Sequence, residues 1–142
     1  MNESTLKRVA AESEIRNLVA RLGHLADDGD LQVYLSLFTP DAEWHTPTGE
    51  VRRGHTDILA GANERRVTGV QGPGTDSRHV NTTLWVEVGD DGTARAQSYF
   101  LYLRSCSTSP VLVSTGRYND EFRETPDGWK MARRVLVADV NG

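Results

Sequence analysis

The stretch "RHVNTTLWVEVGDDGTARAQSYFLYLR", residues 78–104, decides the fold class. Polar and apolar residues alternate on both sides of "GDDG", and a period of two is typical of a β-strand rather than of a helix. The Asp-Gly pair favours a tight turn between antiparallel strands. The stretch therefore predicts a β-hairpin whose arms are residues 78–88 and 93–104.

The same period continues to the end of the chain. "VLVSTGRYNDEFRE" (residues 111–124) and "GWKMARRVLVADV" (residues 128–140) have the pattern of two more strands. "TPDG" joins them as a second hairpin turn, whereas "SCSTSP" (residues 105–110) is a looser connection. The second half of the chain is therefore predicted to be a run of four long antiparallel strands.

The first half has the period of helices. Apolar residues recur every three or four positions from Ile15 to Ala26, and Gly29 ends this amphipathic helix. Asp30 is placed to cap a second short helix, and Thr56 to cap a third over "TDILAGANERRV". Between them, "FTPDAEWHTPTGEVRRG" predicts a short strand followed by a turn.

Helices followed by a run of antiparallel strands predict the α+β class. We expect three N-terminal helices packed on a strongly curved, largely antiparallel mixed sheet, in a cone-shaped α+β barrel with an internal pocket. A chain of 142 residues has the size of one domain, whose core we place at about residues 11–137.

Composition narrows the function classes. The chain is 37% hydrophobic and 25% charged, and it has no apolar run of membrane-spanning length. A net charge of −4 with scattered arginines argues against a nucleic-acid partner. The polar N-terminus lacks a secretory-signal pattern, and the lone Cys106 cannot form an internal disulfide, so we expect a cytoplasmic protein. A long exposed sheet face favours a homodimer or homotrimer.

The run "HLADDGD", residues 24–30, puts three aspartates at the end of the first helix, where the negative pole of the helix disfavours acids. Asp30 caps the next helix, and Asp28 points away from the apolar stripe. Asp27 lies at the border of the stripe and could lean inward. The alternative is that Asp27 is a surface acid tolerated at a fraying helix end.

His79 opens the first long strand, on the face that alternation shares with Asn81, Thr83 and Trp85. A neutral imidazole suits proton abstraction, and it works better when a carboxylate orients its other nitrogen. Asp27 is a candidate for that carboxylate, although a lone strand histidine is more often structural. His24 and His45 remain open as further participants.

No cofactor or metal is predicted. The chain contains no Gly-rich phosphate loop and no nucleophile elbow, and His24, Asp27, His45 and His79 lack a familiar ligand spacing. Side chains that could line a pocket and bind substrate are Tyr34, Trp44, Asn81, Tyr99, Tyr118 and Phe122. Which face of strand residues 117–123 looks into the pocket stays undecided at this point.

At these residues the chain resembles the SnoaL-like branch of the nuclear transport factor 2-like superfamily, whose fold is also called cystatin-like. The resemblance rests on residues 14–44, with Asp27 and Asp30 as an Asp-x-x-Asp pair, and on "RRGHTDI", "SRHVNTTLWVEVGDDGTARAQSYF" and "GRYNDEFRETPDGWKMARR". Similar members include scytalone dehydratase, hexachlorocyclohexane dehydrochlorinase, bile-acid dehydratase and polyketide cyclases.

The resemblance implies that His79 acts as a base and that Asp27 orients it. Ala26 stands where scytalone dehydratase has a tyrosine, and the last two strands contain no counterpart of its second histidine. We therefore expect a cofactor-independent lyase, dehydratase or isomerase acting on a hydrophobic cyclic small molecule. The alternatives are a polyketide-type cyclase and a non-catalytic ligand-binding or assembly module, in which apolar side chains would pack over His79.

Overall fold

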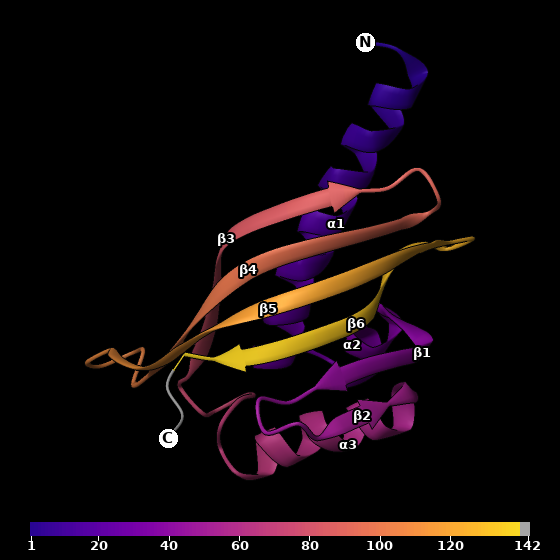
Figure 1. Ribbon diagram of the computed structural model, residues 1–142. Coiled ribbons are helices and arrows are strands. Elements are labelled where there is room, and N and C mark those ends of the chain that lie inside the picture. The colour runs from indigo at the N-terminus through magenta and orange to yellow at the C-terminus, as the bar shows by residue number, and fades with distance from the viewer. Residues whose placement is uncertain (140–142) are drawn as a thin grey trace.

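Six strands form one mixed sheet in the order β2-β1-β6-β5-β4-β3, in a computed structural model that describes residues 1–139 (Figure 1). The elements along the chain are α1 (Glu3–Asp28), α2 (Leu31–Ser36), β1 (Phe38–His45), β2 (Val51–Arg53), α3 (Gly54–Val67), β3 (Arg78–Val88), β4 (Thr93–Arg104), β5 (Val111–Thr125) and β6 (Gly128–Ala138). Neighbouring strands are antiparallel except β1 and β6, which are parallel.

The three helices cover one face of this curved sheet, and the sheet stays open between β2 and β3 (Figure 1). The expected α+β fold with a largely antiparallel mixed sheet is thus confirmed, as an open rather than a closed barrel. The core lies between α1 and the covered face and includes Ile15, Leu22, Phe38 and Met131, all at most 2% exposed. Among the described helices, none is long and apolar enough to cross a membrane.

The predicted strands agree with the structure within two residues, except that predicted strand residue 140 lies outside the described residues. The second helix begins where predicted, whereas the first and third begin earlier. α1 begins at Glu3 rather than near Ile15, with the side chain of Asn2 accepting a hydrogen bond from Thr5 N at 2.8 Å. This added part is polar because it projects past the sheet and buries no stripe (Figure 1). The predicted cap of the second helix is confirmed, because Asp30 Oδ1 accepts from Gln32 N at 2.7 Å.

The predicted cap of the third helix is wrong. α3 begins two residues before Thr56, at Gly54, and follows the short strand β2 that the sequence did not distinguish from a turn. Its N-cap is Arg53, which makes no capping bond through its side chain. The backbone N–H of Arg53 donates to the Asp57 carboxylate at 2.9 Å, so an acid inside the first turn satisfies this end of the helix.

A β-bulge in β3 corrects the predicted face of Trp85. The pairing of β3 with β4 changes register between Thr82 and Trp85, and Thr83 has a positive φ of 54°. One extra residue reverses the inward and outward sides of the rest of the strand. His79 and Asn81 therefore face the helices, whereas Trp85 is 60% exposed on the opposite face.

Gly116 in β5 allows two aromatic rings to stack on the inner face. The rings of Phe100 and Tyr118 have centroids 4.8 Å apart, and Phe100 lies over Gly116. A Cβ on Gly116 would come within 2.5 Å of the Phe100 ring and of the Val137 carbonyl oxygen. Because Gly116 has no side chain, the Phe100 ring can lie over it and stack against the Tyr118 ring.

Gly116→Ala should therefore lower the free energy of unfolding by about 1–3 kcal/mol, the usual cost of overpacking. The measurement is urea unfolding followed by circular dichroism. Gly23→Ala in α1 is the matched control, because its Cβ would meet no atom within 4 Å. It should be neutral or raise stability by up to about 1 kcal/mol through helix propensity. Equal effects of the two substitutions would contradict this account of Gly116.

Candidate functional site

A cation from α3 binds the carbonyl groups at the C-terminus of α1, where the negative pole of the helix disfavours the aspartates. α1 has no basic residue in its last turn. Instead, Nη2 of Arg66 lies 3.1 Å from the carbonyl oxygen of Leu25, 3.3 Å from that of Ala26 and 2.8 Å from that of Gly29. A guanidinium on these carbonyls satisfies free acceptors and opposes the negative pole of the helix.

The fold brings the side chains of Asp27 and His79 close together in space, and the side chain of one other residue lies between them. Asp27 Oδ1 and His79 Nδ1 are 3.8 Å apart, which is ion-pair distance but too long for a hydrogen bond. The side-chain amide of Gln71 bridges them: its Nε2 is 3.0 Å from Asp27 Oδ1 and 3.3 Å from His79 Nδ1. Both Asp27 and His79 have side chains that are 18% exposed.

Gln71 is itself fixed from the end of α3. Its Oε1 accepts from Arg65 Nε at 3.3 Å, and its backbone N–H donates to the Arg65 carbonyl at 3.2 Å. With Oε1 bound to a cation, the amide nitrogen must be the end that faces Asp27 and His79. The Gln71 N–H therefore donates to Asp27, and an unprotonated Nδ1 of His79 can accept from the same amide.

His79 rests on an aromatic ring that is also anchored. The ring centroids of His79 and Tyr102 are 4.5 Å apart, with 31° between the planes. The Tyr102 hydroxyl donates to the carbonyl of Val70 at 2.8 Å, and Ser77 Oγ donates to the same oxygen at 3.1 Å. The loop that carries Gln71 is thereby tied to the sheet that carries His79.

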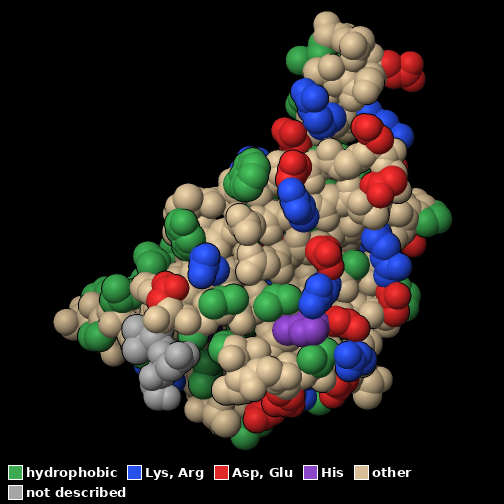
Figure 2. All heavy atoms as spheres, in the orientation of Figure 1, with side chains coloured by type: hydrophobic (Ala, Val, Ile, Leu, Met, Phe, Trp, Pro, Cys, Tyr) green, Lys and Arg blue, Asp and Glu red, His purple; other side chains and the backbone are tan. Residues whose placement is uncertain are grey.

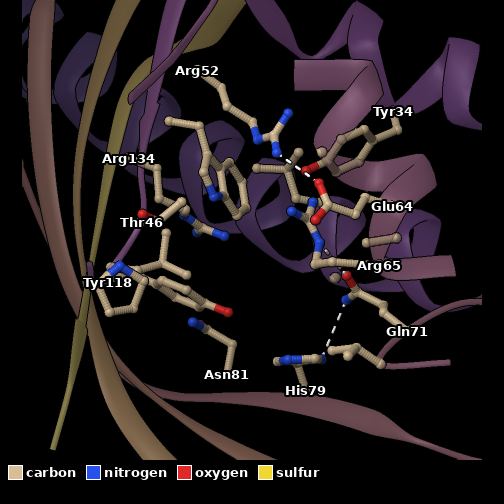
Figure 3. Close-up of a pocket in the computed structure, with 18 of the residues that line it drawn as sticks. Tyr34, Thr46, Arg52, Glu64, Arg65, Gln71, His79, Asn81, Tyr118 and Arg134 are labelled. Carbon is tan, nitrogen blue, oxygen red and sulfur yellow. Dashed lines mark hydrogen bonds and ion pairs between the residues drawn. The ribbon is translucent and has the colours of Figure 1, made fainter. Parts of the chain in front are cut away.

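A cavity of about 350 Å³ opens beside His79, between the sheet and the helices (Figure 3). Four of the predicted substrate-binding residues line it: Tyr34, Trp44, Asn81 and Tyr118. The side chain of Asn81 donates to Ser98 Oγ at 2.9 Å, which holds the amide in place. The question left by the sequence about strand residues 117–123 is answered, because Tyr118 is on the inner face.

Two predicted substrate-binding residues do not line the cavity. Tyr99 is 50% exposed on the outer face of β4, because its neighbours Ser98 and Phe100 take the inner positions. Phe122 shares the inner face of β5 with Tyr118 but lies four residues further along the strand, where it is 1% exposed in the core. Both predictions are therefore wrong for this cavity.

The other two candidate histidines also lie outside this cavity. His24 borders a surface groove between α1 and β3. His45 lies on the opposite face of β1 from Trp44, with Nε2 2.9 Å from Glu43 Oε1. Within residues 1–139, no three His, Cys, Asp or Glu side chains gather closely enough to hold a metal ion.

A buried ion pair supports the wall opposite His79. Nε and Nη2 of Arg134 donate to the two carboxylate oxygens of Asp120 at 2.8 and 2.9 Å. Burial opposes the charge on Arg134, but the Asp120 carboxylate outweighs it and raises the pKa of the guanidinium. The guanidinium lies 3.8 Å from the centroid of the Tyr118 ring. Burial raises the pKa of Tyr118 to about 12, against the opposing charge of Arg134, so the phenol stays protonated.

Sequence reasoning missed Gln71, Arg65 and Arg134. Gln71 lies in the loop "TGVQGPGTDS", which has no periodicity that marks an inward side. Arg65 and Arg66 are adjacent in the last turn of α3, where cations are favoured anyway. Alternation from the core residue Met131 would place Arg134 on the outer face. A register shift in β6 between Met131 and Arg133 turns Arg134 inward, and the sequence pattern does not reveal that shift.

The arrangement is suited to acid–base chemistry. An imidazole lies at the edge of a partly enclosed cavity, a carboxylate supports its far nitrogen through an amide, and phenol and guanidinium groups line the other walls (Figure 3). Such groups can move a proton and stabilise developing negative charge.

Comparison with solved structures shows the same fold throughout the chain. An NTF2-like protein with a cystatin-like fold from Novosphingobium aromaticivorans is 26% identical and has a TM-score of 0.86, over 98% of this chain and 88% of that one. A Catenulispora acidiphila protein in complex with S-DNPA is 27% identical, with a TM-score of 0.77 over 92% of this chain and 95% of that one. Aln2 from a Streptomyces species is 26% identical, with a TM-score of 0.77 over 90% of each chain.

No curated protein sequence matches the chain. The sequence pattern of the SnoaL-like domain, however, matches residues 7–135, which is nearly the whole described structure. The chain therefore belongs to the SnoaL-like domain family, within the nuclear transport factor 2-like superfamily.

Proposed function

We propose that the protein is a cofactor-independent enzyme that uses His79 for general acid–base catalysis on a hydrophobic, cyclic small molecule. The observation that carries this proposal is the cavity beside His79. Nδ1 of His79 is within hydrogen-bond distance of the Gln71 side chain and lies next to Asp27. The reaction class is a lyase, which includes dehydration and cyclase chemistry, or an isomerase. All of these need a proton moved at carbon or oxygen next to an activating group.

The trio of Asp27, Gln71 and His79 supports two protonation arrangements. When Nδ1 accepts from Gln71, the neutral ring carries its proton on Nε2 and can donate a hydrogen bond to a substrate oxygen. When Nδ1 is protonated and turned to Asp27, Nε2 is free to take a proton from the substrate. His79 is therefore a hydrogen-bond donor in one arrangement and the base in the other, and the imidazolium formed by the base can return the proton to a leaving group as the acid. A positioned group of this kind contributes ~10²–10⁴-fold to the rate.

The alternative of a non-catalytic module is less well supported by the packing around His79. In such a module we expected apolar side chains over the imidazole. Instead, one side of the ring contacts Tyr102, and its edge borders a cavity that also contains Asn81, Gln71 and Arg65. A packed core would be lined by apolar side chains, because buried polar groups are costly unless they are paired. Polar side chains around a cavity therefore favour a ligand-processing role.

His79→Ala should lower kcat by ~10²–10⁴-fold, and Asp27→Asn should cause a smaller loss because it removes the charge behind the ring. The assay uses a β-hydroxytetralone, which yields fluorescent α-naphthol on loss of water, together with deuterium exchange at the α-carbon of tetralone. His45→Ala is the matched control, because that histidine contacts Glu43 outside the cavity. Turnover that survives both substitutions, or no turnover of any such cyclic ketone, would sink the assignment.

The tautomer of His79 tests the role of Gln71. In the wild-type protein, neutral His79 should carry its proton mainly on Nε2, because the Gln71 amide donates to Nδ1. Gln71→Leu leaves Asp27 as the polar neighbour of Nδ1 and should shift the proton to that nitrogen. Nitrogen-15 chemical shifts of the ring measure this directly. Gln97→Leu on the outer face is the control, and a wild-type ring already protonated on Nδ1 would contradict the bridge.

We also propose that the protein forms a homodimer or homotrimer through the sheet face turned away from α1. Trp85 and Tyr99 are 60% and 50% exposed there. Charged side chains of both signs are interspersed over the face seen in Figure 2, so a contact there would combine these exposed aromatic side chains with a charged rim.

Light scattering after size-exclusion chromatography should therefore give a multiple of the monomer mass for the wild type. Trp85→Glu combined with Tyr99→Glu should shift the protein toward monomer, because two charges replace apolar contact area. Val67→Glu on α3, where Val67 is 87% exposed, is the control for an added charge elsewhere. A wild-type protein that is monomeric at all concentrations would refute the proposed assembly.

A further inference from the structure

Arg65 differs from the other arginines that line the cavity. Arg52 binds Glu64 at 2.8 Å and Glu50 at 3.3 Å, and Arg134 binds Asp120. Arg65 forms no ion pair with any carboxylate of residues 1–139. Its Nε donates to Gln71 Oε1, and its guanidinium also approaches the Tyr34 hydroxyl closely enough to oppose the rise that burial causes in the pKa of that group.

The position of Arg65 is nevertheless well defined. Its guanidinium lies 5.0 Å from the centroid of the Trp44 ring, within the range of a cation–π contact. Figure 3 shows the side chain directed into the cavity, between Tyr34 and Gln71. A partly buried cation that forms no direct ion pair is stabilised when an anion binds to it.

Tyr34 adds a second donor at the same end of the cavity. The residue is 1% exposed, it lines the cavity, and its hydroxyl has no hydrogen-bond partner in the described chain. Burial raises the pKa of Tyr34, although the charges of Arg65 and Arg134 and the close approach of the Arg65 guanidinium to the hydroxyl oxygen oppose this effect, so the group remains an O–H donor at neutral pH. A buried hydroxyl without an acceptor is rare in native proteins and calls for an explanation.

The acidic groups around the cavity are already engaged. Glu50 and Glu64 are exposed and are bound by Arg52, Asp120 is bound by Arg134, and Asp27 accepts from Gln71. Arg65 itself forms an ion pair with none of these carboxylates, and the O–H of Tyr34 beside it has no acceptor among the described residues.

We propose that Arg65 and Tyr34 form a subsite for an ionised oxygen, a carboxylate or a phenolate, carried by an aromatic small molecule that fills the cavity. The planar guanidinium suits an oxyanion, and the rings of Trp44 and Tyr118 supply the apolar walls for the aromatic part. This inference deepens the proposed function, because it names the class of molecule that His79 would act on.

The test compares ligands of equal shape and different charge. β-Naphthoate and β-naphthamide are titrated against the wild-type protein by isothermal calorimetry, and the change in tryptophan fluorescence provides a second readout. We expect the carboxylate to bind at least about tenfold more tightly than the amide, and this preference to weaken with added salt. A phenolate source is tested with β-naphthol, whose absorption spectrum shifts when the bound molecule is ionised.

Variants assign the preference to the two side chains. Tyr34→Phe, which removes only the hydroxyl, should weaken binding of naphthoate about three- to tenfold and binding of naphthamide by less, because a carboxylate is a stronger acceptor than an amide carbonyl. Arg65→Gln should abolish the preference for naphthoate. Arg117→Gln and Tyr99→Phe, on the outer face, should change neither ligand. If Arg65→Gln does not fold, the two ligands on the wild-type protein and on Tyr34→Phe still decide the matter.

Equal affinity of the wild-type protein for naphthoate and naphthamide, without ionisation of bound naphthol, would overturn the subsite. Because these probes do not react, binding and turnover fail separately. Loss of the anion preference with His79-dependent turnover intact would remove the subsite alone. An anion preference without any turnover would keep the subsite and remove the proposed enzyme.

Discussion

The contact between Arg66 and the last carbonyls of α1 is the interaction on which the site depends. A helix that ends inside a protein leaves carbonyl oxygens without partners and a negative pole. Arg66 satisfies both by crossing from α3, and this fixes the last turn of α3 against the end of α1. The preceding residue, Arg65, then faces the cavity, and its bonds to Gln71 direct that amide at Asp27 and His79.

Some charged side chains of the site form ion pairs with each other, whereas one cation of the site does not. Asp120 and Arg134 form a bidentate pair, so their burial costs little in net charge and supports Tyr118. Arg65 is held by Trp44 and an uncharged amide instead, which keeps it in place without neutralising it. A rigid cation beside an imidazole is a suitable frame for a substrate that carries or develops negative charge, because the frame needs no reorganisation.

The strands could be predicted from sequence because alternation records which side of a strand is buried. The hairpin of β3 and β4 and the face that His79 shares with Asn81 follow from that pattern and from the turn "GDDG". The pattern failed where the backbone departs from regular geometry. The bulge at Thr83 turned Trp85 outward, and Tyr99 could not be placed because alternation does not say which of two faces the helices cover.

The sequence by itself determined the order of elements, the strand face shared by His79 and Asn81, and the candidates Asp27 and His79 as residues suited to proton transfer. Tertiary structure decided how those two residues meet, because Gln71 comes from a loop without periodicity and its position is set by α3 and by Val70 on Tyr102. Tertiary structure also decided that Arg65, among the arginines that line the cavity, forms no ion pair, since ion pairing depends on distances between segments far apart in the chain. Local patterns report burial, whereas the partners of a polar side chain depend on packing that no local pattern records.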